Sequence, residues 1–298
     1  MKRGSTITRE TSEGMALERK MITRRYLLEL VRERCIGCEV CLLVCPQEAI
    51  ERQPGLVENG SIVQNPTIEI DPAKCNFCGE CVVLCPVNAL RLTINGQPEV
   101  PVLQFQAFPE LIKEISVNGA RLLPEAVATC EASCPTEVIH IQVERDGAGQ
   151  VTRVLGIQVD ESNCLYCQQC EAACPGVFTV TNPWQGRVLL DVARCPEGCR
   201  ACVDICPTDA FLMKDSRLIL NEHFCLYCGA CQQVCPAEGA IRVERLRILH
   251  TPIKSAAWTS AVERLISVEA AAQELEAKSQ AKRRQVLSYL PGAGHGGA

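Results

Sequence analysis

Cysteine spacing constrains this chain more than any other feature, because 22 of its 298 residues are cysteines. Twenty of them form five complete runs, in which three closely spaced cysteines precede a Cys-Pro pair. The complete runs are Cys35/Cys38/Cys41/Cys45, Cys75/Cys78/Cys81/Cys85, Cys164/Cys167/Cys170/Cys174, Cys195/Cys199/Cys202/Cys206 and Cys225/Cys228/Cys231/Cys235. The other two, Cys130 and Cys134, form a degenerate run. In bacterial-type spacing three thiolates hold one 4Fe–4S cluster and the fourth reaches a neighbouring cluster. The pattern indicates a chain that stores and passes electrons.

The alternative use of so many cysteines is disulfide bonding, which is typical of secreted chains. Residues 1–22 contain no apolar segment of the kind that a signal peptide needs. No stretch approaches the roughly 18 apolar residues of a membrane helix. We therefore expect a cytoplasmic protein without membrane insertion, in which thiols stay reduced and can bind metal.

The formal net charge of −5 understates the acidity of the loaded protein. Each oxidised cluster with four thiolates carries roughly −2, so five clusters bring the total to about −15. This excess of negative charge disfavours a nucleic-acid partner. Aromatic residues make up only 4% of the chain, so we expect the clusters to supply much of the core and the apo chain to be largely unfolded.

A repeated unit surrounds the cysteine runs: short alternating apolar segments flank a cysteine loop and one helical turn. The predicted fold class is α+β, with tandem two-cluster ferredoxin-like modules and a C-terminal helix. The fourth cysteines of successive runs lie 40, 40 and 29 residues apart when adjacent runs are paired. Pairing of adjacent runs is favoured, and a nested arrangement stays open.

The predicted domain boundaries follow from this pairing. They are a polar, mobile N-terminal extension (1–26), a two-cluster module (27–98), a degenerate one-cluster module (99–192), a two-cluster module (193–250), and a helical extension with a flexible tail (251–298).

Adjacent pairing predicts five clusters and twenty ligands. The predicted sets are Cys35, Cys38, Cys41 and Cys85 (cluster 1); Cys75, Cys78, Cys81 and Cys45 (cluster 2); Cys164, Cys167, Cys170 and Cys134 (cluster 3); Cys195, Cys199, Cys202 and Cys235 (cluster 4); and Cys225, Cys228, Cys231 and Cys206 (cluster 5).

The degenerate run has lost the first two ligands of a sixth site, where Pro124 and Val127 now stand. Cys130 and Cys174 are then non-ligand residues that face each other across a vacated site filled by side chains. Two interpretations stay open: buried, inert small hydrophobes, or a redox or metal role.

Several details accompany the runs. The run that begins at Cys195 has one extra residue before its second cysteine, and Gly198 lets that loop bend tightly. A distinct potential for this cluster and a neutral insertion are both open. Phe77, Tyr166 and Tyr227 precede the second cysteines of their runs, and we expect them to pack against clusters and exclude water. Zinc sites do not call for three cysteines plus a remote Cys-Pro, and no catalytic residue is predicted.

The segment from Ser255 to Leu290 is rich in helix-forming residues, and Trp258, Val262, Leu265 and Ile266 share one face. This face either folds back on the core or docks a partner subunit.

The chain resembles the polyferredoxin family, in particular the polyferredoxin subunit of formylmethanofuran dehydrogenase. The resemblance rests on the tandem cysteine runs, on residues 193–199 (ARCPEGC) and on residues 250–258 (HTPIKSAAW). It implies an electron conduit to a molybdenum or tungsten subunit that reduces CO2. The alternatives are an electron-transfer subunit of a hydrogenase, a formate dehydrogenase or another molybdopterin oxidoreductase, and a free-standing carrier that serves redox enzymes or small ferredoxins.

Overall fold

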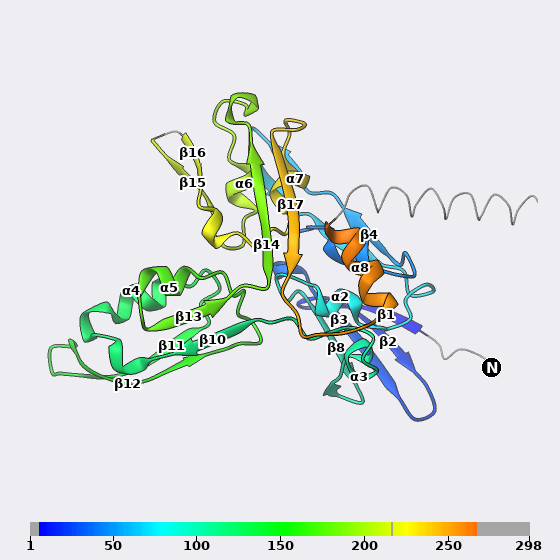
Figure 1. The fold of residues 1–298 in the computed structure, drawn as a ribbon, viewed down its shortest axis with the longest axis horizontal. Coiled ribbons are helices and arrows are strands. Elements are labelled where there is room, and N and C mark those ends of the chain that lie inside the picture. The colour runs from blue at the N-terminus through cyan, green and yellow to red at the C-terminus, as the bar shows by residue number, and fades with distance from the viewer. Residues whose placement is uncertain (1–5, 216, 267–298) are drawn as a thin grey trace, which may run out of the picture.

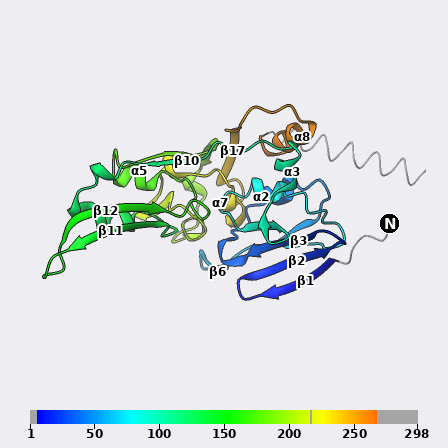
Figure 2. The same ribbon diagram turned by 90° about the horizontal axis from the view of Figure 1, so that it is seen from below.

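The computed structural model describes residues 6–215 and 217–266, and it combines short helices with short strands in a mixed α+β fold (Figure 1). Three bodies meet near the centre of the molecule in Figure 1, and in the perpendicular view of Figure 2 the part coloured green extends away from the part coloured blue. Among the described residues, none of the helices has the length and apolar character that crossing a bilayer requires.

Each body is bounded by an outer pair of antiparallel strands. These pairs are β3 (Arg25–Val31) with β8 (Leu90–Ile94), β10 (Glu114–Val117) with β13 (Phe178–Thr181), and β14 (Trp184–Leu190) with β17 (Ile241–Ile248). Each outer pair encloses two consecutive cysteine runs, and we call the enclosed bodies the first (25–94), second (114–181) and third (184–248) modules. The strand β14, which lies ahead of the predicted boundary at residue 193, pairs with β17 of the third module.

An inner hairpin separates the two cysteine runs of every module. The inner pairs are β4 (Ile50–Gln53) with β7 (Thr67–Ile70), β11 (Ile139–Arg145) with β12 (Val151–Val159), and β15 (Phe211–Lys214) with β16 (Arg217–Leu220). These strands are the alternating apolar segments of the sequence, in which every second side chain faces the core.

One short helix follows the second cysteine position of each run and contains the third cysteine. The helices are α1 (Val40–Val44), α2 (Glu80–Val83), α4 (Val127–Ala132), α5 (Gln169–Ala173), α6 (Ala201–Asp204) and α7 (Ala230–Val234). Each stops ahead of a Cys-Pro pair, because proline disfavours helical backbone in the residue before it. The two helices of each module contact each other.

The predicted polar and mobile N-terminal extension is wrong for residues 6–20. They form the hairpin of β1 (Thr6–Thr11) and β2 (Gly14–Lys20), which joins a sheet of order β1-β2-β3-β8-β9, where β9 is Gln97–Pro98. Leu17 is fully buried, and the buried carboxylate of Glu18 pairs with Arg9 at 2.6 Å and Arg25 at 2.5 Å. Cross-strand ion pairs of this kind let a polar segment join a sheet. The composition of the segment alone does not predict them.

The described part of the C-terminal segment folds back on the first module. Helix α8 (Ala256–Ile266) contacts α1, and Trp258, Ala261 and Leu265 are buried in one cluster with Val40 and Val44. Phe108, which follows α3 (Pro101–Gln104), packs edge-on to the Trp258 indole with ring centroids 5.2 Å apart. The predicted helix beyond residue 266 lies outside the described residues.

A second hairpin within the first module reaches the third. Its strands are β5 (Leu56–Glu58) and β6 (Ser61–Gln64). At its turn the Gly60 carbonyl accepts a hydrogen bond of 2.7 Å from the Arg200 amide, and the Ile62 amide donates to Asp204 at 3.2 Å. The first and third modules are therefore packed together, although the second module separates them in sequence.

Candidate iron–sulfur centres

The loop between the first and second cysteines has one backbone shape in all five complete runs. The residue before the second cysteine has a left-handed conformation in each, at Gly37, Phe77, Tyr166, Gly198 and Tyr227, with φ between 48° and 72°. Such a conformation is costly for aromatic residues, and strain of this kind concentrates at ligand sites. The same backbone occurs at glycines, such as Gly198 with a φ of 72°, and at aromatic residues. The loop shape is therefore imposed by the site and not by the residue type.

A second left-handed residue follows the second cysteine in four of the runs, at Glu39, Gly79, Gln168 and Gly229. The run that begins at Cys195 departs from this pattern, because Arg200 has a φ of −131°. The run with the extra residue between Cys195 and Cys199 therefore differs from the others in the backbone that follows Cys199. Whether the cluster there has a distinct potential stays a prediction.

Backbone amides point at several sulfurs. The Ala49 amide donates to Cys45 Sγ at 3.3 Å, and the Ala89 amide donates to Cys85 Sγ at 3.2 Å. The Tyr166 amide donates to Cys164 Sγ at 3.4 Å. Hydrogen bonds to cluster sulfurs are one of the means by which a protein sets reduction potentials.

Cysteines from different runs meet around shared cavities. One cavity is lined by Cys45, Cys75, Cys78 and Cys81, together with apolar side chains that include Phe77. A second is lined by Cys206, Cys225, Cys228 and Cys231. In each cavity the fourth cysteine of one run faces the first three of the next.

The electrostatic neighbours of Cys170 and Cys202 have the same grouping. Burial, with added contributions from Cys164 and Cys134, raises the pKa of the Cys170 thiol to about 12. Burial likewise raises the pKa of Cys202 to about 12, with added contributions from Cys199, Cys195 and Cys235. Burial also raises the pKa of Cys41, whose leading cysteine neighbour, Cys81, belongs to the other predicted set of the module.

These thiols fit a cationic polynuclear group. Burial and crowding disfavour bare thiolates, whereas a bound metal deprotonates a coordinating thiol outright. Within the described residues, no three cysteine, histidine or carboxylate side chains converge tightly enough to hold a single metal ion. Each four-cysteine cavity offers thiols from two runs that fit the ligand set of a 4Fe–4S cluster.

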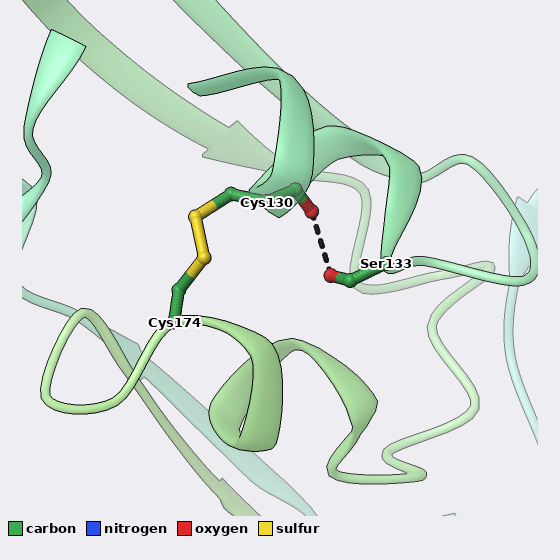
Figure 3. The surroundings of a disulfide bond; sticks show 3 residues. All are labelled: Cys130, Ser133 and Cys174. Carbon is green, nitrogen blue, oxygen red and sulfur yellow. Dashed lines mark hydrogen bonds between the residues drawn. A yellow bond between two sulfur atoms is a disulfide. The ribbon is translucent and has the colours of Figure 1, made fainter. Parts of the chain in front are cut away.

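The degenerate repeat holds a covalent link in place of ligands. Cys130 on α4 and Cys174 after α5 form a disulfide with a Cα–Cα distance of 6.0 Å, and both residues are buried (Figure 3). The Ser133 hydroxyl donates to the Cys130 carbonyl at 2.7 Å. Around the pair, Leu122, Val127 and Phe178 are buried in one apolar cluster. The structure thus joins these two cysteines, instead of leaving them as separate inert thiols.

Two of the three aromatic residues in the runs are buried. Phe77 and Tyr166 lie with neighbouring cysteines, whereas Tyr227 is half-buried and packs against the apolar cluster that contains Trp184. Their packing against bound clusters stays a prediction. The Arg19 guanidinium of β2 lies 4.6 Å from the Phe77 ring centroid. A cation above the ring is a contact that the cysteine pattern could not reveal, because Arg19 lies in the N-terminal hairpin.

Two cations beside the sites were also missed by the sequence-based prediction. Arg245 on β17 donates to the Cys228 carbonyl at 2.5 Å, and Lys113 lies 5.5 Å from the Tyr166 ring centroid. Burial lowers the pKa of both cations, and nearby cysteines raise it. Neither residue belongs to a cysteine run, so no local motif marks it.

The fold and these sites define a multi-cluster iron–sulfur protein that transfers electrons. The chain belongs to the 4Fe-4S dicluster domain family, whose model matches residues 34–89, 128–176 and 194–239. Each match spans two consecutive cysteine runs or, in the second, the degenerate run and its neighbour.

Relatives of known name are electron-transfer proteins. The thiosulfate reductase electron transfer subunit PhsB of Salmonella typhi is 36% identical over 206 residues, which cover 67% of this chain and 80% of that protein. Polyferredoxin protein MvhB of Methanothermobacter marburgensis is 27% identical over 108 residues, which cover 33% of this chain and only 25% of MvhB. The chain is accordingly homologous to an electron-transfer subunit of an oxidoreductase.

A solved structure has the same fold over nearly the whole chain. It is a chain in the formate dehydrogenase–heterodisulfide reductase–formylmethanofuran dehydrogenase complex of Methanospirillum hungatei. The match has a TM-score of 0.75 and 25% identity, and it covers 89% of this chain and 92% of that chain.

Proposed function

We propose that the chain holds five 4Fe–4S clusters with the twenty ligands grouped as predicted. The observation that supports this best is the pair of cavities in which four cysteines from two consecutive runs converge. In the second module Cys134 faces Cys164, Cys167 and Cys170, and each of these three thiols has Cys134 among its electrostatic neighbours. The vacated site keeps no cluster, since Cys130 and Cys174 are bonded to each other.

The proposed domains are three ferredoxin-like modules, each with two consecutive runs. The outer strand pairs support boundaries near residues 25–94, 114–181 and 184–248. This proposal favours adjacent over nested pairing of the runs.

The chain's own residues bind the clusters, orient them and exclude water. The one-electron chemistry is supplied by the clusters when they are bound. The left-handed loops turn amides toward the sulfurs, and buried aromatic and aliphatic side chains keep the cavities dry. A rigid frame of this kind keeps the ligand positions unchanged as the charge of the site changes.

The proposed role is that of an electron-relay subunit in a complex related to formylmethanofuran dehydrogenase. Its support is the similarity in fold over 89% of the chain to a member of a complex that includes this enzyme. The expected partners are molybdenum or tungsten enzyme subunits.

A second candidate is an electron-transfer subunit of another oxidoreductase. The 36% identity to PhsB over 80% of its length favours this alternative, as does 33% identity over 106 residues to formate hydrogenlyase subunit 2 of Escherichia coli. A free-standing carrier is the third possibility.

Anaerobic purification of the tagged full-length chain from its own cells, followed by mass spectrometry of the co-purifying proteins, separates the three. A formylmethanofuran dehydrogenase subunit supports the first role. A reductase or hydrogenase subunit supports the second. Isolation of the chain alone at every salt concentration contradicts both subunit roles.

A further inference from the structure

The contacts between modules, rather than the ligand runs, determine how the five sites are connected. Three sets of contacts converge on one proposed site, that of cluster 1, with Cys35, Cys38, Cys41 and Cys85 as its proposed ligands. The inference below rests on the proposed ligand grouping and extends it to the order of the sites.

The first contact is within the first module. Cys41 on α1 has Cys81 on α2 as its leading electrostatic neighbour after burial. Helices α1 and α2 contact each other, and both cysteines belong to one buried cluster of side chains. Clusters 1 and 2 are therefore neighbours.

The second contact joins the first module to the third. Cys38 and Arg245 line one cavity of about 450 Å³ together with Gly229, which adjoins Cys228. Arg52 crosses the same boundary, since it donates to the Gly37 carbonyl at 3.2 Å and to the Gln233 carbonyl at 3.3 Å. Cys228 is the leading electrostatic neighbour of Cys38 after burial. Clusters 1 and 5 therefore meet at this boundary.

Arg245 lies at the junction between clusters 1 and 5. It donates to the Cys228 carbonyl, while its Nε is buried without a hydrogen-bond partner among the described residues. Gly229 leaves the space that this guanidinium occupies, because a Cβ at that position would lie 3.2 Å from Arg245 Nη2. A buried positive charge with an unused donor suits a site that gains negative charge on reduction.

The third contact joins the first module to the second. The Asn88 side-chain amide, three residues after Cys85, donates to the Cys164 carbonyl at 3.0 Å. Asn163 accepts hydrogen bonds from Arg91, at 3.3 Å, and from Arg34. Lys113 lies on the side of the second module, with its ammonium 5.5 Å from the Tyr166 ring centroid, and both Cys164 and Cys85 act to raise its pKa. Clusters 1 and 3 therefore meet with Lys113 between them.

We propose that cluster 1 is the branch point of the electron path, with clusters 2, 3 and 5 as its three neighbours and with Lys113 and Arg245 as positioning charges at two of the junctions. Cluster 4 follows cluster 5 within the third module, where Cys202 is an electrostatic neighbour of Cys231. The lost site of the second module then lies on a side branch. Electrons pass between the first and third modules without it.

Two neutral substitutions in the loaded full-length chain test this order. Removing a cation beside a cluster disfavours the added electron and lowers the potential. Arg245→Met should lower the midpoint potentials of two electron paramagnetic resonance (EPR) signals, those of clusters 1 and 5. Lys113→Met should also lower two, those of clusters 1 and 3. One signal must therefore shift in both variants, and three signals shift in total.

The matched controls are Arg247→Met, exposed on the same strand as Arg245, and Lys214→Met, exposed on β15. Neither should shift a signal. Iron content verifies loading of every variant, and Arg245→Gln replaces Arg245→Met if the latter does not load. Cys38→Ser should alter the signal that both variants share.

The branch point is overturned if the two signals shifted in Arg245→Met and the two shifted in Lys113→Met have no signal in common. It is also overturned if neither variant shifts the midpoint potential of any signal. Such outcomes leave the five-cluster proposal intact, since that proposal fails separately, when wild-type iron and spectra do not account for five clusters.

Discussion

Breaking the Cys130–Cys174 disulfide should loosen the second module and leave the other two unchanged. The bond joins α4 to the end of α5, and these helices belong to the two halves of the module. In a module with both clusters, a cluster would connect the halves at this place. The disulfide takes over that connection.

The size of the effect depends on whether cluster 3 persists when the module opens. The two cysteines are 44 residues apart, and closing such a loop is worth about 4 kcal/mol in the chain-entropy description. Cluster 3 already joins Cys134 to Cys170, so in the loaded protein the remaining loop is only about 8 residues, and the bond is worth about 2.5 kcal/mol. Since 1.4 kcal/mol corresponds to a factor of ten, exchange of local amides should accelerate about 60-fold in the loaded protein.

Hydrogen exchange of the loaded chain, followed by mass spectrometry of peptides from α4 and β11, measures this. The paired variant Cys130→Ala with Cys174→Ala should match wild-type protein treated with a thiol reductant. The reduced wild type keeps both sulfur atoms, so it separates the lost bond from lost packing. Peptides from β15 and β16 serve as the internal control.

Unchanged exchange of α4 and β11 in the reduced wild type would refute the reasoning. So would an equal acceleration in the third module, since the effect would then be global. An acceleration near 1,000-fold would mean that the full loop of about 4 kcal/mol is released, and hence that cluster 3 does not persist in the open form.

Three further predictions concern loading and packing. Wild-type protein should contain about 20 iron atoms per chain. Cys134→Ala should lower the iron content to about 16 atoms, whereas Cys174→Ala should leave it at about 20. Equal losses of iron in the two variants would contradict the ligand grouping. Trp258→Ala removes a buried side chain between α8 and the first module and should destabilise the docking of α8 by about 3–5 kcal/mol, measured by hydrogen exchange of α8 amides. The control Thr259→Ala, at an exposed position, should change the docking free energy by less than about 0.5 kcal/mol. Similar values for the two variants would disprove the docking. Gly60→Ala should loosen the β5–β6 hairpin and shift the EPR signal of cluster 4, because the new Cβ would lie 2.6 Å from Cys199 Cα. The control Gly96→Ala, with a similar φ of +80° and open space around it, supplies the same backbone strain without the clash. Equal effects of the two changes would count against the contact between Gly60 and Cys199.

Local chemistry in this chain could be predicted from the sequence because it depends on short spacings. The runs specify where thiols, turns and single helical turns occur, and the alternating segments around them predict the inner hairpins. Gly198 has the left-handed backbone that its place in the longer loop requires. The α+β class and the electron-transfer function follow from the same pattern.

Features that rely on distant partners were missed or left open. The N-terminal residues were predicted to be a polar extension, because the ion pair between Glu18 and Arg25 forms only when their two strands pair. For Trp258 the sequence allowed either a core or a partner, and the apolar surface of α1 decides in favour of the core for the described part of the helix.

The sequence by itself determined which residues can bind clusters, since a thiolate's chemistry and its spacing along the chain are both local properties. Tertiary structure alone decided what lies between the modules. Arg245 and Lys113 are ordinary charged residues in the sequence, and they gain a proposed role only where packing partly desolvates them beside cysteines of two different modules. The physical reason is that desolvation strengthens a charge's interactions, and burial is a property of the assembled fold.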